Sequence, residues 1–409
     1  MNTFSLALAS IRTRKLSSAL CIMAVAAGVA LLSSSYSVSQ SIADSFRRNG
    51  AGIDMVIGPK GSPLQLVLSS VYHSDIPAGN FELEDAEKLL SDPRVRLAVP
   101  LVMGDSYRGW RLVGSTQDYL KLYKAEIAEG QLNANEHEAV AGALTDIPVG
   151  ARFEATHGFS PDGTDVHHDH GYIVTGRLKP TGTVLDRLIV TDLHSIQEAH
   201  EHGHEGEHVG DDDHEATHEH EEEHGGEVTA LLIQVRSRTD LINLPRLVNQ
   251  TTGMTAAVPA HEIARLATSL GVGRDILFAL SAGFVALSGV MLFGLLSASL
   301  VNRRYDLAVM RTLGASQGKI WLTVIFEGAL LAGVGSVVGL LLGRILVIAT
   351  VTHIGGISTL APAHEIYILQ LSDLGFLFCG ILVGIVAAFL PAVSAARTDI
   401  AQVLAQGRT

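Results

Sequence analysis

Charge is scarce in this sequence, and the places where it is missing indicate the class of protein. Asp, Glu, Lys and Arg make up only 17% of the 409 residues, whereas 47% are hydrophobic. Apart from Glu327, no charged residue occurs in the four stretches 16–43, 276–301, 320–343 and 374–396. Each stretch is longer than the roughly 20 residues that a helix needs to cross about 30 Å of hydrocarbon. The pattern excludes an ordinary soluble protein and predicts four transmembrane helices.

Cysteine is also scarce. Cys21 and Cys379 are the two cysteines, and both lie inside predicted membrane helices. The long segment between the first two helices contains none, so we expect it to fold without disulfides. A cysteine buried in a membrane helix usually behaves as a small apolar residue, and neither one is assigned a function.

Basic residues are missing from the connection 352–373, and this sets the orientation of the chain. They cluster instead before the first helix, between the second and third, and after the fourth: Arg12, Arg14, Lys15, Arg303, Arg304, Arg311, Lys319, Arg397 and Arg408. Lys and Arg near membrane helices favour the cytoplasmic side. We therefore expect a multi-pass protein of the bacterial inner membrane, with its long segment in the periplasm. A cleaved signal peptide in place of the first helix would leave three spans with the wrong parity.

These observations predict the following organisation. The membrane helices are expected at 16–38, 275–301, 320–351 and 374–396. The large periplasmic domain occupies 39–274, and a short periplasmic loop occupies 352–373. The cytoplasmic parts are the N-terminus 1–15, a coupling loop 302–319 and the tail 397–409.

The periplasmic domain has the composition of a mixed α/β fold. Runs rich in Val, Ile and Thr predict strands at 95–103, 110–113, 171–175, 184–191 and 228–235. Short helices are expected at 81–90 and 116–123. At its two ends the domain continues the helical spacing of the neighbouring spans, through Val38, Ile42, Ser45 and Phe46 and through Ile263, Leu266, Ala267 and Leu270. These two stalk helices could pair through their apolar faces or lie independently.

Three glycines recur at four-residue spacing in the third predicted span. Gly335, Gly339 and Gly343 would lie on one helix face and let another backbone approach closely in lipid. The spacing does not decide whether that neighbour belongs to the same chain. Arg344 follows directly and is expected to extend its head group to water at the outer interface.

Lys and Arg are again absent from the segment 198–227, which is otherwise the most polar of the chain. It contains ten Glu, three Asp and eight His, and its 13 acidic residues match the formal net charge of −13 of the whole chain. Such a segment cannot bury enough apolar area to offset its ordering entropy, so we expect a disordered loop.

The histidines of this loop are candidate metal ligands. Neutral imidazole suits Zn²⁺, Ni²⁺ and Cu²⁺, and carboxylates add further donors. The candidates are His200, His202, His204, His208, His214, His218, His220 and His224, with His167, His168 and His170 as a second group. Zinc is the first choice. The alternative is a solvated acidic linker in which the histidines bind nothing. A zinc-protease motif is missing, since His261-Glu262 and His364-Glu365 lack a second His at the required spacing.

The cytoplasmic loop has an amphipathic pattern. Leu307, Met310 and Leu313 recur every three residues beside Arg303, Arg304, Asp306 and Arg311, and Gly314 ends the run. A short helix of this kind can lie on the membrane surface or dock into a groove on a cytoplasmic partner. A phosphate-binding loop is absent, because Gly314–Ile320 has one residue too few and Ile where a hydroxyl is needed. Any nucleotide hydrolysis therefore requires another chain.

This loop resembles the coupling region of the FtsX/MacB-type (type VII) ABC permeases. The family's order of Arg, acidic residue, apolar pair, Arg, Leu, Gly and Ala is matched over 303–315. The resemblance continues at Glu327-Gly328, at Pro391–Arg397 and at Val403-Leu404. Together with the three glycines of the third span, Glu327 is expected to take part in helix packing. In the outer domain, Thr181-Gly182-Thr183 followed by Asp186-Arg187 is also similar. The His-rich loop departs from the family.

The resemblance implies a four-span permease without its own ATPase domain, paired with a cytoplasmic ABC ATPase and a second permease copy. The chain itself would not be an enzyme. Stalk helices would carry ATP-driven motion to the periplasmic domain, which would act on a cargo, an adaptor or a metal-binding protein. The chain is expected to contact membrane lipid and to bind no nucleic acid. The alternative is a membrane-anchored regulator of a periplasmic enzyme or envelope process that transports nothing. A third alternative, a metal-dependent envelope enzyme, has little support because the sequence shows no defined triad of metal ligands.

Overall fold

The structure is a computed structural model that describes residues 12, 15–86, 91–132, 135–158, 166–204, 226–353 and 371–397. The chain divides into two compact units. One comprises Met1–Ile42 and Leu270–Thr409, and the other comprises Ala43–Ser269. Two helices run without a break from one unit into the other: α2 (Lys15–Asn49) and α8 (Pro259–Val301). The stretches predicted as stalks are thus continuous with the first and second spans.

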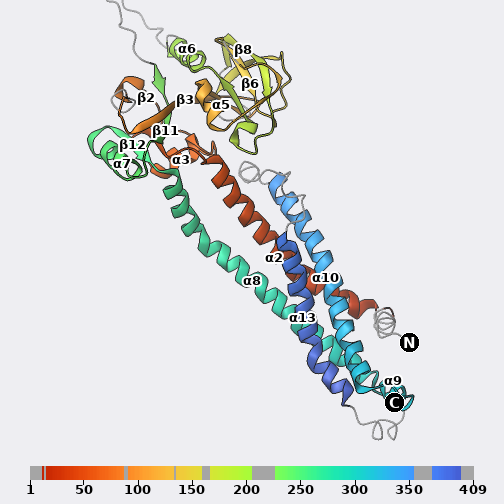
Figure 1. Ribbon diagram of the computed structural model, residues 1–409. Coiled ribbons are helices and arrows are strands. Elements are labelled where there is room, and N and C mark those ends of the chain that lie inside the picture. The colour runs from red at the N-terminus through yellow and green to blue at the C-terminus, as the bar shows by residue number, and fades with distance from the viewer. Residues whose placement is uncertain are drawn as a thin grey trace, which may run out of the picture. The chain divides into compact units, whose positions relative to one another are not determined.

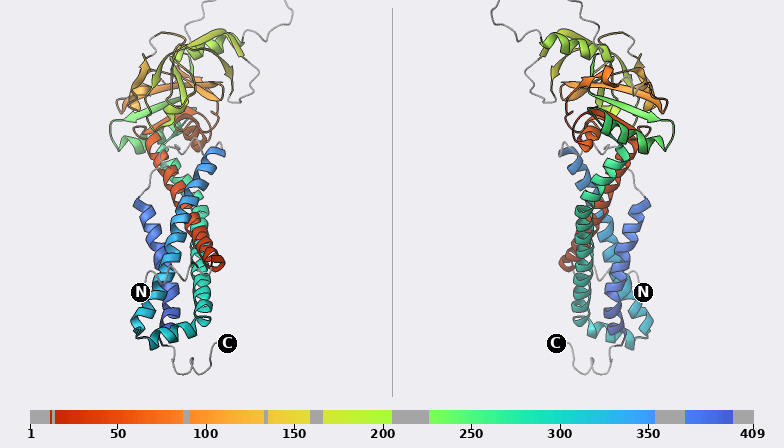
Figure 2. Two further views of the ribbon diagram at one scale, coloured as in Figure 1. Left: turned by 90° about the vertical axis from the view of Figure 1, so that its right-hand side faces the viewer. Right: turned by 90° about the vertical axis from the view of Figure 1, so that its left-hand side faces the viewer.

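The first unit is a helical bundle. Helices α2, α8, α10 (Gln317–His353) and α13 (Leu371–Ala396) each contain an apolar stretch long enough to cross a membrane. In this unit they lie side by side, and the short helix α9 (Arg304–Thr312) joins the ends of α8 and α10 (Figures 1 and 2). All four contribute to one buried cluster, which includes Cys21, Val25, Leu292, Leu296, Leu331, Ala332 and Ala388. The four charge-free stretches therefore build one bundle.

The second unit is built on a ten-stranded mixed sheet in the order β12-β1-β11-β3-β4-β9-β6-β8-β5, with β7 paired to β3 and β8. Its strands are β1 (Met55–Pro59), β3 (Val95–Tyr107), β4 (Trp110–Ser115), β5 (Ile127–Gly130), β6 (Glu138–Ala141), β7 (Arg152–His157), β8 (Val166–Leu178), β9 (Leu188–Thr191), β11 (Ala230–Val235) and β12 (Met254–Ala257). A separate pair joins β2 (Phe81–Glu82) to β10 (Glu227–Val228).

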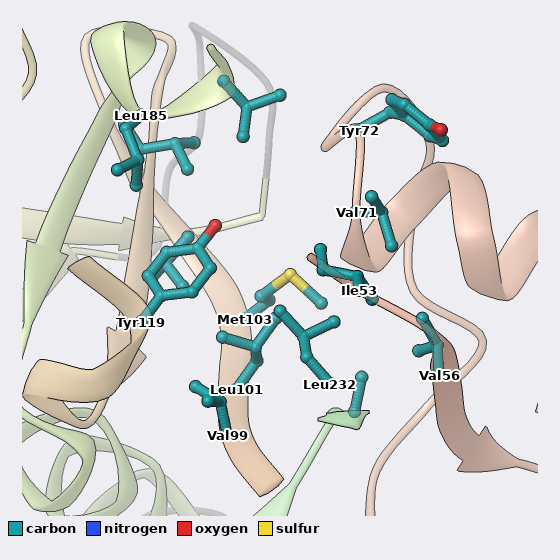
Figure 3. Packing of buried hydrophobic residues seen from close by; sticks show 14 of the residues in the cluster. Ile53, Val56, Val71, Tyr72, Val99, Leu101, Met103, Tyr119, Leu185 and Leu232 are labelled. Atoms are coloured by element: carbon teal, nitrogen blue, oxygen red, sulfur yellow. The ribbon is translucent and has the colours of Figure 1, made fainter. Parts of the chain in front are cut away.

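Helices α3 (Pro63–Ser70), α5 (Gln117–Leu122), α6 (Leu193–His204) and α7 (Asp240–Thr251) belong to the same unit, with the 3-10 turns η1 (Leu83–Ala86) and η2 (Val184–Arg187). The sheet is buried on both faces where β11 pairs antiparallel with β1 and β3. Successive side chains of a strand point to opposite faces, so Leu232 joins one apolar cluster while Leu231 and Ile233 join another. Figure 3 shows the first cluster, where Met103 lies between Tyr119 and Ile53.

Most of the predicted strands are present, and two predictions were wrong in part. Residues 95–103, 110–113, 171–175 and 228–235 fall within strands, apart from a break at Thr229, and 116–123 contains α5. Residues 81–90 were predicted as a helix, but the chain forms β2 and then η1. Residues 184–191 were predicted as one strand, but β9 begins only at Leu188, because the side chain of Asp186 holds the preceding residues in a turn.

Candidate functional site

Helix α9 ends, and α10 begins, with local signals that the sequence carries. It ends in a Schellman motif: Gly314, at φ +94°, follows the last turn, its N–H donates to the Arg311 carbonyl, and Ala315 N–H donates to the Met310 carbonyl. A positive φ is a conformation that glycine adopts at little cost. Ser316 then caps α10, since its hydroxyl accepts the N–H of Lys319 at 3.3 Å. The loop between α8 and α10 is therefore a defined structure with its own helix.

The inner face of α9 packs on the bases of two membrane helices. Leu307 and Ala308 are buried, and Met310 is partly buried. Leu307 joins a cluster with Ile320 and Val324 of α10 and with Ala392 and Ala395 of α13. Two of the three apolar residues that define the predicted amphipathic pattern therefore hold α9 against the bundle.

The other residues predicted for the coupling region are exposed or partly exposed. Leu313 is 83% exposed, although the sequence pattern grouped it with Leu307 and Met310. It differs from them because it lies past the end of the helix, on the turn that Gly314 closes. Arg304, Asp306 and Gly314 are also exposed, and Arg311 is partly exposed. An isolated apolar side chain among charged groups can enter a pocket on a partner, and the charges around it can set the orientation of docking.

Glu327 connects this region to the third span. Its carboxylate is buried and lies 3.7 Å from the guanidinium of Arg303, the residue that precedes α9. A carboxylate in an apolar helix needs a partner to offset its desolvation, and Arg303 supplies one. The sequence placed Glu327 among the helix-packing residues; the structure also pairs it with the coupling loop.

The glycine stripe of α10 faces α2 of the same chain. A Cβ atom added at Gly335 would lie 2.8 Å from the Cβ of Val25, and one added at Gly339 would lie 2.6 Å from the Ala26 carbonyl oxygen. A Cβ at Gly343 would meet the hydroxyl of Ser33. The neighbour helix that the spacing left open is therefore α2. A second close contact, of Gly328 with Gly384, joins α10 to α13.

The prediction for Arg344 was wrong. Instead of extending to water, its guanidinium binds the carboxylate of Asp373 at 2.6 Å, and both side chains are largely buried. Asp373 lies just before the fourth charge-free stretch, and that position was the only signal for this pair in the sequence. The ion pair ties the periplasmic end of α10 to the start of α13.

Five of the eleven candidate metal ligands lie outside the described residues. His208, His214, His218, His220 and His224 fall there, whereas the predicted loop overlaps α6, which extends to His204 and includes the positions of His200 and His202. The loop prediction therefore began too early, because Ile196, fully buried, anchors this helix. His167, His168 and His170 belong to strand β8. Within the described part of the chain, no group of three or more His, Cys, Asp or Glu side chains is placed to hold a metal ion.

Comparisons with known proteins agree with this architecture. The MacB-like periplasmic core domain family matches residues 18–243, more than half of the chain, and the FtsX-like permease C-terminal family matches residues 278–400. The chain belongs to the FtsX/MacB-type permease family. It is accordingly a multi-pass inner-membrane protein with four spans and a large mixed α/β periplasmic domain. This permease family works with a cytoplasmic ABC ATPase supplied by a partner.

Two solved structures are similar to the periplasmic part of this permease. The periplasmic region of MacB from Actinobacillus actinomycetemcomitans is 11% identical and covers 55% of this chain and 97% of its own, with a TM-score of 0.33. The extracellular domain of the noncanonic ABC-type transporter YknZ from Gram-positive bacteria is 13% identical and covers 50% and 98%, with a TM-score of 0.29. None of the curated proteins that were compared matches the permease.

Proposed function

We propose that this permease couples ATP hydrolysis in a separate cytoplasmic subunit to mechanical work on a periplasmic cargo or partner, and that it is not itself an enzyme. The observation that carries the proposal is that α9 is packed on the bundle by some of its residues and exposes others. Leu307 seats it on α10 and α13, whereas Arg304, Asp306 and Leu313 are exposed. A push on the exposed residues would pass directly into the bundle through Leu307 and the Arg303–Glu327 pair.

The docking surface is therefore narrower than the sequence pattern implied. Leu307 and Met310 support α9 from behind, while Leu313, Gly314, Arg304, Asp306 and Arg311 form the proposed contact with the ATPase. A second copy of the permease completes the proposed complex, since the resemblance implies a dimer of transmembrane subunits. A periplasmic adaptor or a metal-binding protein is a further proposed partner.

Co-purification tests the coupling proposal. The full chain is isolated in mild detergent, and the proteins that accompany it are identified for the unmodified permease, for Leu313→Asp and for Ile242→Asp. Ile242 is 68% exposed on α7 of the periplasmic unit, so it matches the chemical change at a site that the ATPase does not reach. We expect an ABC ATPase with the unmodified chain and with Ile242→Asp, and its loss with Leu313→Asp. Absence of an ATPase from the unmodified permease would refute the proposal.

We also propose that the His-rich segment 198–227 links this activity to a transition metal, zinc in the first place. The support is compositional: eight histidines and 13 acidic residues occur within 30 positions that contain no Lys or Arg. So many imidazole and carboxylate donors in one short segment suit a sensor or a buffer better than a closed structural site. Titration of the full permease with Zn²⁺, compared with a variant in which these histidines are replaced by serine, tests the link. Millimolar affinity, or equal binding by both proteins, would contradict it.

A further inference from the structure

Helix α2 ends inside the periplasmic unit, on a residue that is fixed from three sides. Asn49 is 2% exposed. Its side-chain Oδ1 accepts the N–H of Val184 at 2.9 Å, and its Nδ2 donates to the hydroxyl of Ser45 at 3.2 Å. Its main-chain carbonyl accepts the hydroxyl of Tyr123 at 3.1 Å. Val184 and Tyr123 are far from Asn49 in the sequence, so their contacts hold the helix end within the tertiary structure.

The loop that receives Asn49 is shaped by one buried carboxylate. Asp186 is 4% exposed, and its Oδ1 accepts the N–H and the hydroxyl of Thr181 at 2.7 and 2.8 Å. Its Oδ2 accepts the N–H of Gly182 at 2.8 Å. Gly182 adopts φ +69° and turns its carbonyl toward α2, where it accepts Nε of Arg48 at 3.1 Å. These contacts give the sequence pattern a structural role: Asp186 fixes the turn at Thr181 and Gly182.

Two tyrosines complete this arrangement. The last carbonyls of a helix lack partners within it and must find them elsewhere. Tyr72 donates to the Phe46 carbonyl at 3.3 Å while its ring packs edge-on against Phe46, and Tyr123 donates to the Asn49 carbonyl. Burial raises the pKa of Tyr72 to about 12 and raises that of Tyr123 further, so both hydroxyls remain protonated donors at neutral pH.

We propose that these residues form a socket that joins the first span to the periplasmic domain and transmits movement between them. The socket consists of Tyr72, Tyr123, Gly182, Val184 and Asp186, and it receives Arg48 and Asn49 at the end of α2. Asp186 is its positioning residue, because it sets the turn without touching α2 in the hydrogen bonds above. The inference rests on the proposed function, since it names where mechanical work leaves the membrane helix. A continuous helix that is bound at its last turn moves the periplasmic domain with it when it rotates or shifts. A loosely attached helix would move without moving the domain.

Hydrogen exchange on the full permease in lipid nanodiscs tests the socket first without any partner. Tyr123→Phe and Tyr172→Phe are a matched pair, because each removes one buried tyrosine hydroxyl that donates to a main-chain carbonyl at 3.1 Å. Tyr172 donates to Ser195 and does not contact α2 through that hydroxyl. We expect exchange at the Val184 amide to accelerate roughly two- to tenfold in Tyr123→Phe and in Asp186→Ala, and to stay unchanged in Tyr172→Phe. Equal exchange in all four proteins would overturn the socket.

Transmission is then measured on the complex with its co-purified ATPase. ATP is expected to change hydrogen exchange in the periplasmic unit of the unmodified permease and of Tyr172→Phe. In Asp186→Ala the ATPase should still co-purify, while the ATP-dependent change in the periplasmic unit is lost. If Asp186→Ala responds like the unmodified protein, the socket is not the joint. If the unmodified permease brings no ATPase or shows no response to ATP, the proposed function fails, and the transmitting role of the socket fails with it.

Discussion

Replacement of Gly339 by alanine should loosen the membrane bundle, although alanine is the better helix former. A Cβ at this position would lie 2.6 Å from the Ala26 carbonyl oxygen and 2.9 Å from the Cβ of Val29, both on α2. Separations this short require α2 and α10 to move apart. Gly283 in α8 is the matched control, because a Cβ there meets nothing within 4 Å.

The expected magnitude follows from two opposing effects. Both substitutions gain helix propensity, about 1 kcal/mol for Gly→Ala in a helix interior. At Gly339 alone, overpacking costs about 1–3 kcal/mol. The free energies of unfolding of the two variants should therefore differ by about 1–3 kcal/mol, with Gly339→Ala the less stable. At roughly 2–4 °C per kcal/mol for a unit of this size, the melting temperatures should differ by about 2–12 °C.

A native cysteine reports this change. Cys21 is 2% exposed within the bundle cluster, whereas Cys379 is exposed. In a Cys379→Ser background, a dye that fluoresces on reaction with thiols follows the opening of the bundle at Cys21 as temperature rises. The close contact between α2 and α10 would be shown unimportant if Gly339→Ala and Gly283→Ala melted at the same temperature.

Three further predictions concern charged and titratable groups. Asp373→Asn should lower the free energy of unfolding by about 3–5 kcal/mol in the thiol assay, because it removes the carboxylate that binds the buried charge of Arg344. Replacing both residues of the pair by apolar ones, Met for Arg344 and Leu for Asp373, should leave stability nearly unchanged. Equal losses of stability in the single and the double variant would contradict this. In a double-mutant cycle, Arg303→Ala and Glu327→Ala should couple by about 0.5–3 kcal/mol, and additive losses would show that the pair is not an interaction. Burial lowers the pKa of His73 to about 3 from 6.5, so the unfolded chain binds a proton that the folded protein excludes. The free energy of unfolding should therefore fall by up to about 1.4 kcal/mol per pH unit below roughly pH 6.5. In thermal melts of the full chain, His73→Phe should weaken this dependence of stability on pH. The same dependence in His73→Phe and in the unmodified protein would refute the prediction.

The sequence was most informative where one physical requirement acts alone. A helix that crosses lipid must be apolar over its full length, so the four spans could be recognised without tertiary information. Strands such as β3 and β11 are rich in Val and Leu because both of their faces are buried. The glycine stripe indicated close packing, but it carried no information on the partner, since the residues of α2 that it meets, such as Val25, Ala26, Val29 and Ala30, do not distinguish α2 from the other apolar helices.

Prediction failed where a polar side chain overrides local propensity. Val184–Thr191 has the composition of a strand, yet Asp186 bonds back to Thr181 and Gly182 and delays the strand until Leu188. Leu313 follows the period of Leu307 and Met310, but helix α9 ends before it. Such reversals depend on hydrogen bonds that no hydrophobic period records.

Under the proposed coupling, the contacts inside the two units favour α2 over α8 as the helix that would carry force outward. Helix α9 is seated on α10, and the glycine stripe of α10 holds α2 backbone to backbone, so a displacement at α9 reaches α2 through close-packed contacts. The apolar stretch of α2 is 44% buried within the chain, whereas that of α8 is 17% buried. Because α2 also ends in the proposed socket at Asn49, it is held at both ends of its path. Under the proposed coupling, force entering at Leu313 should therefore leave the membrane mainly through α2. Loosening the contact at Gly339 and loosening the turn at Asp186 should then impair the same transmission at two different points along α2.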